Sequence, residues 1–496
     1  MSNMETTVQR SIFTGAVRAD SEYRQLLASV GVQRRANPKP VLVTGLCEGA
    51  CDALSAALCE DMPGGRPAVI ICPEEKECLR LASIATSLGL RAAFYPVRDL
   101  NFYNITASRE FEHNRLGVLF GISGGLFDVI LTTPDAALGY TMPPSSLANN
   151  LISVSLDDGE CGGISALVDS LTAAGYIRAD APGSETLGSS GLVEGAGQFA
   201  VRGGIVDVAA PSMRIVRADG SRDGGAFALR IEFFGDEIDR MGLFDTATQR
   251  VTEQIKSAVL TPARELLAGR DELAAISAAV RSLRKKTKDP RVGDELDGEL
   301  AALDTAIAAG GEVRFLDKYI SLIYSEKSCL LDYFSPMSLC LIRGNAAVSD
   351  RLKAAEWHAA KEAEEMVASG VIAGKYAEYS APASRLTGFI SKHTTVLLDS
   401  LMQGMSGAEL GGLYGFRTKH SLSCAGNDAL LREELEGYVK GGYRVVLMAG
   451  SESAAANYAG LLREWGFNAR DAGDGNALDP DTVDRGEVAV ISSAPI

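Results

Sequence analysis

Short runs of consecutive apolar residues alternate with helical patterns between residues 20 and 150. The runs lie at residues 40–45, 67–73, 91–96 and 128–134. Strands that alternate with helices are typical of a parallel sheet, because each parallel strand needs a long crossover connection. Apolar runs without polar interruptions also indicate strands that are buried on both faces. The sequence therefore predicts an α/β domain that is built on a parallel sheet.

The character of the chain changes near residue 150. Residues 181–198 form a Gly/Ser-rich loop, and residues 198–211 and 228–245 then show the two-residue alternation of strands with one polar face. This change predicts an inserted domain with antiparallel strands. Beyond residue 263 helical patterns dominate, and an apolar strand returns at residues 338–344.

Residues 386–496 have the pattern of a further small α/β unit, which stops within a strand–helix repeat. We therefore expect the chain to be a segment of a longer protein. The predicted parts are the first half of the parallel-sheet domain (1–150), the inserted domain (151–262), a mostly helical completion of the first domain (263–385) and the small α/β domain (386–496).

The first apolar run leads into a sequence with the layout of a phosphate-binding loop. VLVTGLCEGACDAL (41–54) places a strand before a glycine-bearing turn and a helix, as G-x-x-x-x-G-K-[ST] does. Ala50 stands where the lysine would contact phosphates, and Cys51 stands where a hydroxyl would bind magnesium. Thr44 replaces the first glycine, whereas Gly49 matches the second. The residues indicate either a misread nucleotide site or one that has lost its chemistry.

The net charge of −16, with 48 basic against 64 acidic residues, argues against nucleic-acid binding without sequence preference. Such binding needs Lys and Arg to displace counterions from phosphates. A basic run at residues 281–288 lies at the C-terminal end of a predicted helix. The helix dipole and solvent explain this run, and a contact with DNA or another domain is the alternative.

Several functional classes lack their sequence signatures. The nine cysteines and four histidines show no zinc-ligand spacing, so no metal site is predicted. Scattered cysteines fit reduced thiols in the cytosol. The N-terminus has no apolar core of a signal peptide, and no apolar run is long enough to span a membrane. We therefore expect a cytoplasmic protein without membrane contact. No G-x-S-x-G nucleophile and no catalytic carboxylate pair can be assigned.

Three motifs in order carry a resemblance: QFAVRGGIVDV (198–208), EFFGDEIDR (232–240) and LLDYF (330–334). Together they resemble UvrB, a component of the bacterial excinuclease. They resemble more closely the non-catalytic copy of that module at the N-terminus of bacterial transcription-repair coupling factors. The resemblance spans residues 20–385, with weaker agreement to the end. It implies a RecA-like parallel-sheet domain without a working P-loop, interrupted by an α+β insert and followed by a small α/β domain.

Two departures from UvrB concern its ATP site. UvrB has an intact P-loop, and after LLDYF it has a strand that ends in an acidic pair for magnesium and water. Here the strand at 339–342 ends in Arg343-Gly344. Both halves of an ATP site are therefore missing. Gly49, Ala50, Cys51, Arg343 and Gly344 mark a degenerate nucleotide site, and we expect no ATP or magnesium in this segment.

A third departure concerns DNA. UvrB inserts a long aromatic hairpin that clamps damaged DNA, and the corresponding stretch at 98–119 is short in this chain. Ordinary loop packing explains its aromatic residues.

The inserted domain offers a candidate binding face. Alternate residues of the strand 229–234 face opposite ways, which puts Arg230 and Phe234 on the polar side, where Arg202 also lies. One interpretation is a solvated Arg–Glu pair with a partly buried Phe. Another is a binding hot spot, because Arg and aromatic residues are enriched there. The resemblance favours the second. In coupling factors this insert docks the excinuclease protein UvrA, and the family's interface residues fall on Arg202, Arg230 and Phe234.

Two hypotheses follow. In the first, the chain is a non-catalytic adaptor that recruits UvrA. The missing C-terminal part would bind RNA polymerase and carry an ATP- and magnesium-dependent DNA translocase. The family also suggests that this module packs against the translocase until the polymerase is engaged. In the second, the chain is a divergent UvrB-like motor or damage-recognition protein, with Lys39 or Arg343 as its phosphate-binding cation. The net acidity and the short 98–119 stretch count against the second.

Overall fold

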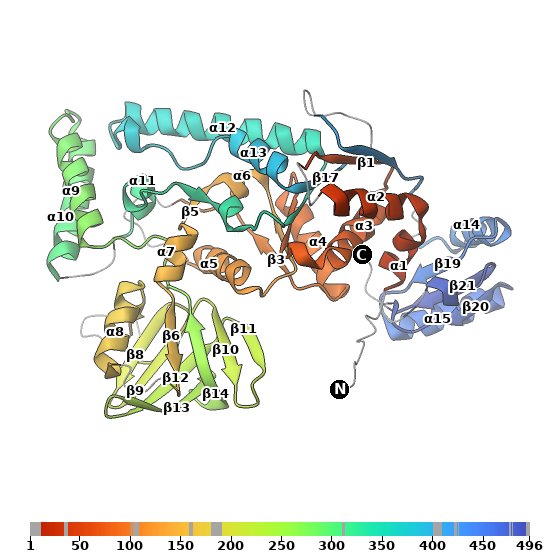
Figure 1. Cartoon of the computed structure of the whole chain (residues 1–496), viewed down its shortest axis with the longest axis horizontal. Helices are drawn as coiled ribbons and strands as arrows, with labels where there is room; N and C mark the ends of the chain where they lie inside the picture. Colours follow the sequence, from red (N-terminus) through yellow and green to blue (C-terminus); the bar gives the residue numbers. More distant parts are fainter. Residues whose placement is uncertain are drawn as a thin grey trace.

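The computed structural model describes residues 11–33, 38–100, 102, 109–157, 162–179, 191–309, 313–399, 409–420, 424, 426–475, 478 and 480–492. Figure 1 shows a central body of helices around one sheet, an insert of strands below one end of this body, and a small α/β unit at the other end. The predicted fold class, a parallel-sheet domain interrupted by an α+β insert and followed by a small α/β domain, is confirmed.

The body is built on a seven-stranded sheet in which every pairing is parallel. In spatial order its strands are β18 (Gly412–Gly415), β1 (Val41–Thr44), β17 (Thr394–Leu398), β16 (Leu339–Arg343), β2 (Ala68–Ile71), β4 (Val129–Thr132) and β3 (Ala92–Tyr95). The four predicted apolar runs between residues 40 and 134 supply β1, β2, β3 and β4.

Both faces of this sheet are buried, so its strands feed two cores. In β2, Val69 and Ile71 belong to one core and Ile70 belongs to the other. The core that contains Ile70 packs against helices α2 (Ser21–Gln33), α3 (Glu48–Asp61) and α4 (Glu75–Ser87). Helix α1 (Ile12–Ala19) packs on α3. Burial on both faces explains why the strands lack polar alternation.

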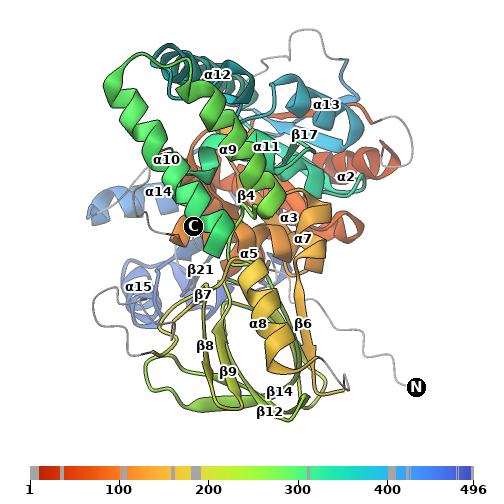
Figure 2. The same cartoon turned by 90° about the vertical axis from the view of Figure 1, so that its left-hand side faces the viewer.

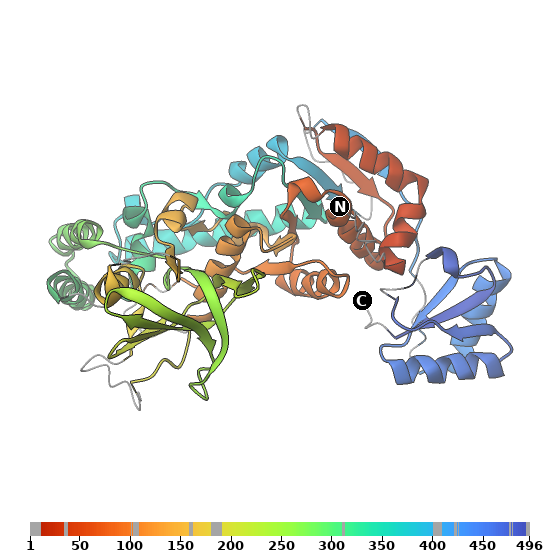
Figure 3. The ribbon, with the colours of Figure 1, turned by 60° about the horizontal axis from the view of Figure 1, so that its bottom comes forward.

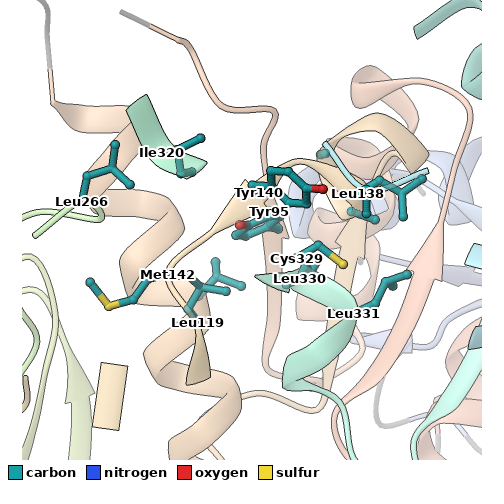
Figure 4. Close-up of a cluster of buried hydrophobic side chains, with 14 of the residues drawn as sticks. Tyr95, Leu119, Leu138, Tyr140, Met142, Leu266, Ile320, Cys329, Leu330 and Leu331 are labelled. Atoms are coloured by element: carbon teal, nitrogen blue, oxygen red, sulfur yellow. The ribbon is translucent and has the colours of Figure 1, made fainter. Parts of the chain in front are cut away.

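The other core is larger and holds most of the remaining helices. Its helices are α5 (Glu110–Gly124), α6 (Pro134–Leu138), α7 (Pro144–Asn149), α9 (Arg270–Arg284), α10 (Pro290–Ala309), α11 (Ile320–Ile323), α12 (Asn345–Ala368) and α13 (Ser384–Lys392). A short ribbon of β5 (Tyr140–Thr141) and β15 (Ser328–Cys329) runs beside it. Figure 4 shows Tyr95 and Leu119 of this core among Cys329, Leu330 and Leu331. Leu330 and Leu331 begin the LLDYF motif, which is therefore a packing element.

The insert is a nine-stranded, mostly antiparallel sheet with helix α8 (Gly163–Ala173) on one face (Figure 2). In spatial order its strands are β11 (Arg222–Gly225), β10 (Met213–Arg217), β14 (Val251–Leu260), β13 (Glu237–Phe244), β12 (Ala228–Phe234), β9 (Ile205–Ala209), β8 (Gln198–Arg202) and β7 (Ile177–Arg178). Strand β6 (Ile152–Ser155) pairs with β14. Leu229 and Ile231 of β12 lie in the core beneath α8, on the face that the alternation predicted.

The small unit at the end of the chain is a parallel sheet ordered β19 (Val445–Met448), β21 (Glu487–Ile491), β20 (Asn468–Asp471), with helices α14 (Asp428–Lys440) and α15 (Glu452–Glu464) (Figure 3). The sequence assigned all of residues 386–496 to this unit, and the first part of that assignment is wrong. Strands β17 and β18 flank β1 in the large sheet instead. A short apolar run predicts a strand but carries no information about which sheet it joins.

A cluster of buried charges joins the insert to the body. Glu265, which follows β14, is fully buried. Arg115 of α5 donates to both of its carboxylate oxygens, at 3.0 Å each. Arg98 lies 2.8 Å from Oε1 of Glu265 and also donates to Asp317. Burial alone would raise the pKa of Glu265, but the charges of Arg115 and Arg98 outweigh it and lower this pKa to about 2.

We expect Glu265→Gln to lower the free energy of unfolding by about 3–5 kcal/mol, because Arg115 and Arg98 would stay buried without their counter-charge. Urea unfolding followed by circular dichroism measures this change. Glu253→Gln is the matched control. Glu253 pairs with Arg217 at a partly exposed site, where we expect a change within about 1 kcal/mol.

The pH dependence gives a second readout of the same substitution. Folding depresses the pKa of Glu265, so its contribution is complete above the ordinary carboxyl pKa of 4.5 and is lost as pH falls through about 2. The difference in unfolding free energy between wild type and the Glu265→Gln variant should therefore shrink over this range. A difference that is independent of pH would contradict the assignment.

Candidate functional site

The structure places the degenerate phosphate loop between β1 and α3. Gly45 has φ +78°, and α3 begins at Glu48, so Gly49, Ala50 and Cys51 all lie in its first turn. A strand, a turn and a helix N-terminus are thus present, as in a P-loop. The retained part of the motif is its backbone path.

Another segment of the chain lies against this loop. The backbone N–H of Phe416 donates to the carbonyl of Thr44 at 2.9 Å, and Cys47 N–H donates to the hydroxyl of Thr418 at 2.6 Å. A Cβ on Gly45 would lie 2.0 Å from the carbonyl oxygen of Phe416. In a P-loop, such backbone N–H groups cradle phosphate oxygens. Here the N–H of Cys47 is already bonded to the protein itself.

Charged side chains fill the space beside α3. Arg343, at the end of β16, donates to Asp52 at 2.6 Å and to Glu77 at 2.8 Å. Arg80 pairs with the other oxygen of Asp52 at 2.6 Å and with Glu48 at 2.9 Å. The side chain of Asp52 is fully buried and that of Arg343 is 6% exposed. A guanidinium thus occupies the strand end where an ATPase needs a carboxylate for its metal.

The predicted residues of the degenerate site do come together. Arg343 contacts Asp52, which directly follows Gly49, Ala50 and Cys51 in α3. Gly344 has φ +66° and is the N-cap of α12. Sequence reasoning identified the missing lysine and acidic pair but missed Asp52 and Glu77, the partners of Arg343. That the site binds no nucleotide stays a prediction.

We expect the double substitution Ala50→Lys with Cys51→Thr to leave the chain without magnesium-dependent ATP hydrolysis. It restores the motif residues, but Arg343 still replaces the metal-binding carboxylate and residues 416–418 still cover the loop. Phosphate release measures the outcome, with UvrB as the positive control. Turnover in the double variant would show that the loop alone had lost the chemistry.

The insert presents two arginines that share one buried carboxylate. Asp207 of β9 is 1% exposed, and the strand register places it opposite Arg230 of β12. Arg230 donates to both oxygens of Asp207, from Nε at 2.7 Å and from Nη2 at 2.9 Å. Arg202, at the end of β8, pairs with the same carboxylate. Figure 2 shows the three strands side by side.

The two arginines differ in how firmly they are held. Arg230 also donates to the carbonyl of Gln249 at 3.2 Å and lies 5.0 Å from the ring of Phe244, so its side chain is 16% exposed. Hydrogen bonds with Asp207 raise the pKa of Arg230, so it stays charged. Arg202 is 41% exposed. Sequence analysis did not identify Asp207, although an acidic residue between two valines in IVDVA was a signal for a buried, paired carboxylate.

Phe234 is the last residue of β12 and is 82% exposed, the highest fraction among the large exposed apolar side chains of the described residues. It lies four residues beyond Arg230, on the strand that Asp207 holds in register with β9. Of the two interpretations offered by the sequence, the partly buried Phe is therefore wrong. The Arg–Glu pair is also wrong, because Arg230 pairs with Asp207. An exposed aromatic ring on a strand that also carries an ordered guanidinium group is typical of a protein-binding surface.

Two further features concern metal binding and membrane contact. Among the described residues, no three His, Cys, Asp or Glu side chains gather in a way that could hold a metal ion. None of the described helices is long and apolar enough to cross a membrane. In the 98–119 stretch, residues 101 and 103–108 lie outside the described residues, and α5 accounts for the part from Glu110 onwards.

Comparisons with known proteins find similarity both to the insert alone and to most of the chain. Residues 154–266 match the family described as the UvrB interaction domain. The transcription-repair-coupling factor of Bacillus subtilis (strain 168) is 23% identical over 443 residues, which cover 87% of this chain and 35% of that protein. The corresponding factor of Haemophilus influenzae is 23% identical over 55% of this chain and 21% of its own length. UvrABC system protein B of Chlorobium phaeobacteroides is 30% identical over 29% of this chain and 21% of its own length.

These matches confirm the resemblance that the three motifs predicted. The chain is similar to the N-terminal region of transcription-repair coupling factors, and it spans about a third of the length of the Bacillus subtilis relative. Its relatives are DNA-repair proteins of the transcription-coupled and UvrB-like types.

Proposed function

We propose that this coupling-factor-type segment is a non-catalytic adaptor whose insert docks UvrA. The observation that carries the proposal is Phe234, 82% exposed, on the strand whose Arg230 shares a buried carboxylate with Arg202. These residues lie within the part of the chain that matches the UvrB interaction domain. A guanidinium already oriented by Asp207 can donate hydrogen bonds to a partner carboxylate without first losing side-chain freedom.

The longer protein that the resemblance implies would couple this docking to transcription. We propose that its further domains bind RNA polymerase and DNA and carry the ATP- and magnesium-dependent translocase. The adaptor would then bring UvrA to a stalled polymerase for nucleotide excision repair in the cytoplasm. Contact between this segment and the motor domains would keep the docking face covered until the polymerase is engaged.

The alternative, a divergent UvrB-like motor or damage-recognition protein, needs a cation for the phosphates. Lys39 pairs with Glu409 at 2.7 Å, and Arg343 pairs with Asp52 and Glu77. A nucleotide would have to displace carboxylates from either cation. This requirement favours the adaptor.

A binding titration with UvrA tests the proposal. We expect Arg202→Ala, Arg230→Ala and Phe234→Ala each to weaken binding by about tenfold or more, as loss of a hot-spot residue does. Phe234→Ala is the cleanest of the three, because an exposed side chain contributes little to stability. Phe111→Ala is the matched control, since Phe111 is 55% exposed on α5.

Two outcomes would contradict the adaptor. Equal loss in the Phe111→Ala control would mean that the insert face is not the docking surface. Magnesium-dependent ATP hydrolysis without binding to UvrA would favour the motor.

We expect Asp207→Asn to weaken binding of UvrA even though the side chain is too buried to reach a partner. The substitution keeps the size of the side chain but removes the charge that orients Arg202 and Arg230. The same titration measures this effect, at a temperature where circular dichroism shows the variant to be fully folded. Asp304→Asn is the control, because Asp304 pairs with Arg281 at an exposed site. Unchanged affinity in the folded Asp207→Asn variant would show that Asp207 serves stability alone.

A further inference from the structure

A cleft of about 930 Å³ lies between the insert and the body. One wall is a face of the strands β10, β11 and β14. The other is formed by the ends of α4 and α5 with the turns that follow them. This volume lies within the range of small-molecule sites, which is roughly 300–1,000 Å³. The cleft is separate from the degenerate phosphate loop, none of whose residues line it.

The strand register places two arginines on the cleft wall. Arg214 of β10 pairs with Gly224 of β11, and Val216 pairs with Arg222. Because alternate residues of a strand share a face, Arg214 and Arg222 are diagonal neighbours on one face of the sheet, about 7–8 Å apart between their Cα atoms. Val259 of β14 is paired with Arg214 and lies on this face too.

Two glycines bring this face close to the body. A Cβ on Gly224 would lie 2.7 Å from Leu126, and a Cβ on Gly124 would lie 2.5 Å from Nη1 of Arg214. The two surfaces therefore approach closely at these glycines, and the cleft opens beside them. Arg91 enters from the opposite wall, 55% exposed and paired with Asp128 at 2.8 Å.

The charge of the cleft is unbalanced. The guanidinium of Arg214 stacks over the ring of Phe120 at 4.6 Å. Within the described part of the chain, the side chains of Arg214 and Arg222 make no hydrogen bond and no ion pair. Six other arginines pair with carboxylates: Arg18, Arg98, Arg115, Arg230, Arg343 and Arg351. Asp223, the acidic residue along the cleft, pairs with Arg217 at 2.8 Å. The cleft therefore has two arginine side chains without a carboxylate partner among the described residues and a third that has one, which makes its wall positively charged in a chain of net charge −16.

We propose that this cleft binds a nucleoside diphosphate. Arg214 and Arg222 would each hold a phosphate group, because a guanidinium presents paired donors that match phosphate oxygens. The half-buried side chains of Leu126, Phe127 and Val259 form the apolar part of the lining, on which the base would lie. The proposal is independent of the adaptor function, since β13 lies between the cleft strands β10, β11 and β14 and the strands β9 and β12, which carry the proposed docking face.

Calorimetric titration of the 496-residue chain with ADP tests the proposal. We expect binding that weakens by about tenfold or more in Arg222→Glu and in Arg214→Gln, because each loses charge-assisted hydrogen bonds. Arg222 is exposed and without an ion pair among the described residues, so Arg222→Glu should stay folded. Arg291→Glu, at the exposed start of α10, is the control for net charge.

A second control separates the cleft from the degenerate loop. Gly49→Glu places a negative charge in the first turn of α3, where a Cβ meets nothing within 4 Å. We expect ADP binding to survive this substitution. Binding that is lost in Gly49→Glu but kept in Arg222→Glu would overturn the proposal, as would the absence of ADP binding at millimolar concentration. Neither result would bear on the docking of UvrA, which the Phe234→Ala titration decides.

Discussion

The relation between the insert and the body depends on the buried carboxylate of Glu265. Two guanidinium groups meet it, from α5 and from the segment after β3, and Arg98 extends the cluster to Asp317. The backbone of Glu265 is held as well. Its N–H donates to the side chain of Glu112 at 2.7 Å, and its carbonyl accepts from the hydroxyl of Tyr324 at 2.9 Å. Desolvated charges are tolerated only when each has its partner, so the cluster admits one arrangement of these segments. That arrangement positions both the proposed docking face and the cleft.

The same rule applies to the segment that has the layout of a phosphate-binding loop. A phosphate site leaves cationic and N–H donors unpaired until the ligand arrives, and in this chain they find partners within the protein. Arg343 donates to Asp52 and Glu77, and the N–H of Cys47 donates to the hydroxyl of Thr418. The strand and helix keep their apolar packing against the sheet. The fold of this segment rests on buried apolar area, whereas phosphate binding would rest on a few polar groups.

Sequence patterns predicted the parts of the structure that depend on local spacing. The unbroken apolar runs predicted strands buried on both faces, and the alternation in β12 predicted that Arg230 lies opposite the core. Such patterns could not predict which residues far apart in the sequence contact each other. Arg115 and Glu265 are 150 positions apart, and Arg343 and Asp52 are 291 apart. No strand was predicted at the position of β17, and its place between β1 and β16 is decided by strand pairing that no local pattern encodes.

The proposed docking face has two arginines that differ in how freely their side chains can move. Arg230 is fixed by Asp207, by Gln249 and by Phe244, so its charge is an ordered part of the sheet. Arg202 has the same carboxylate but is 41% exposed, which leaves it able to turn towards an incoming acid. If Arg202 leaves, Arg230 still balances Asp207 through two hydrogen bonds, so the buried carboxylate is never unpaired. A shared acid of this kind lets a surface release one guanidinium to a partner without exposing the core to an isolated charge.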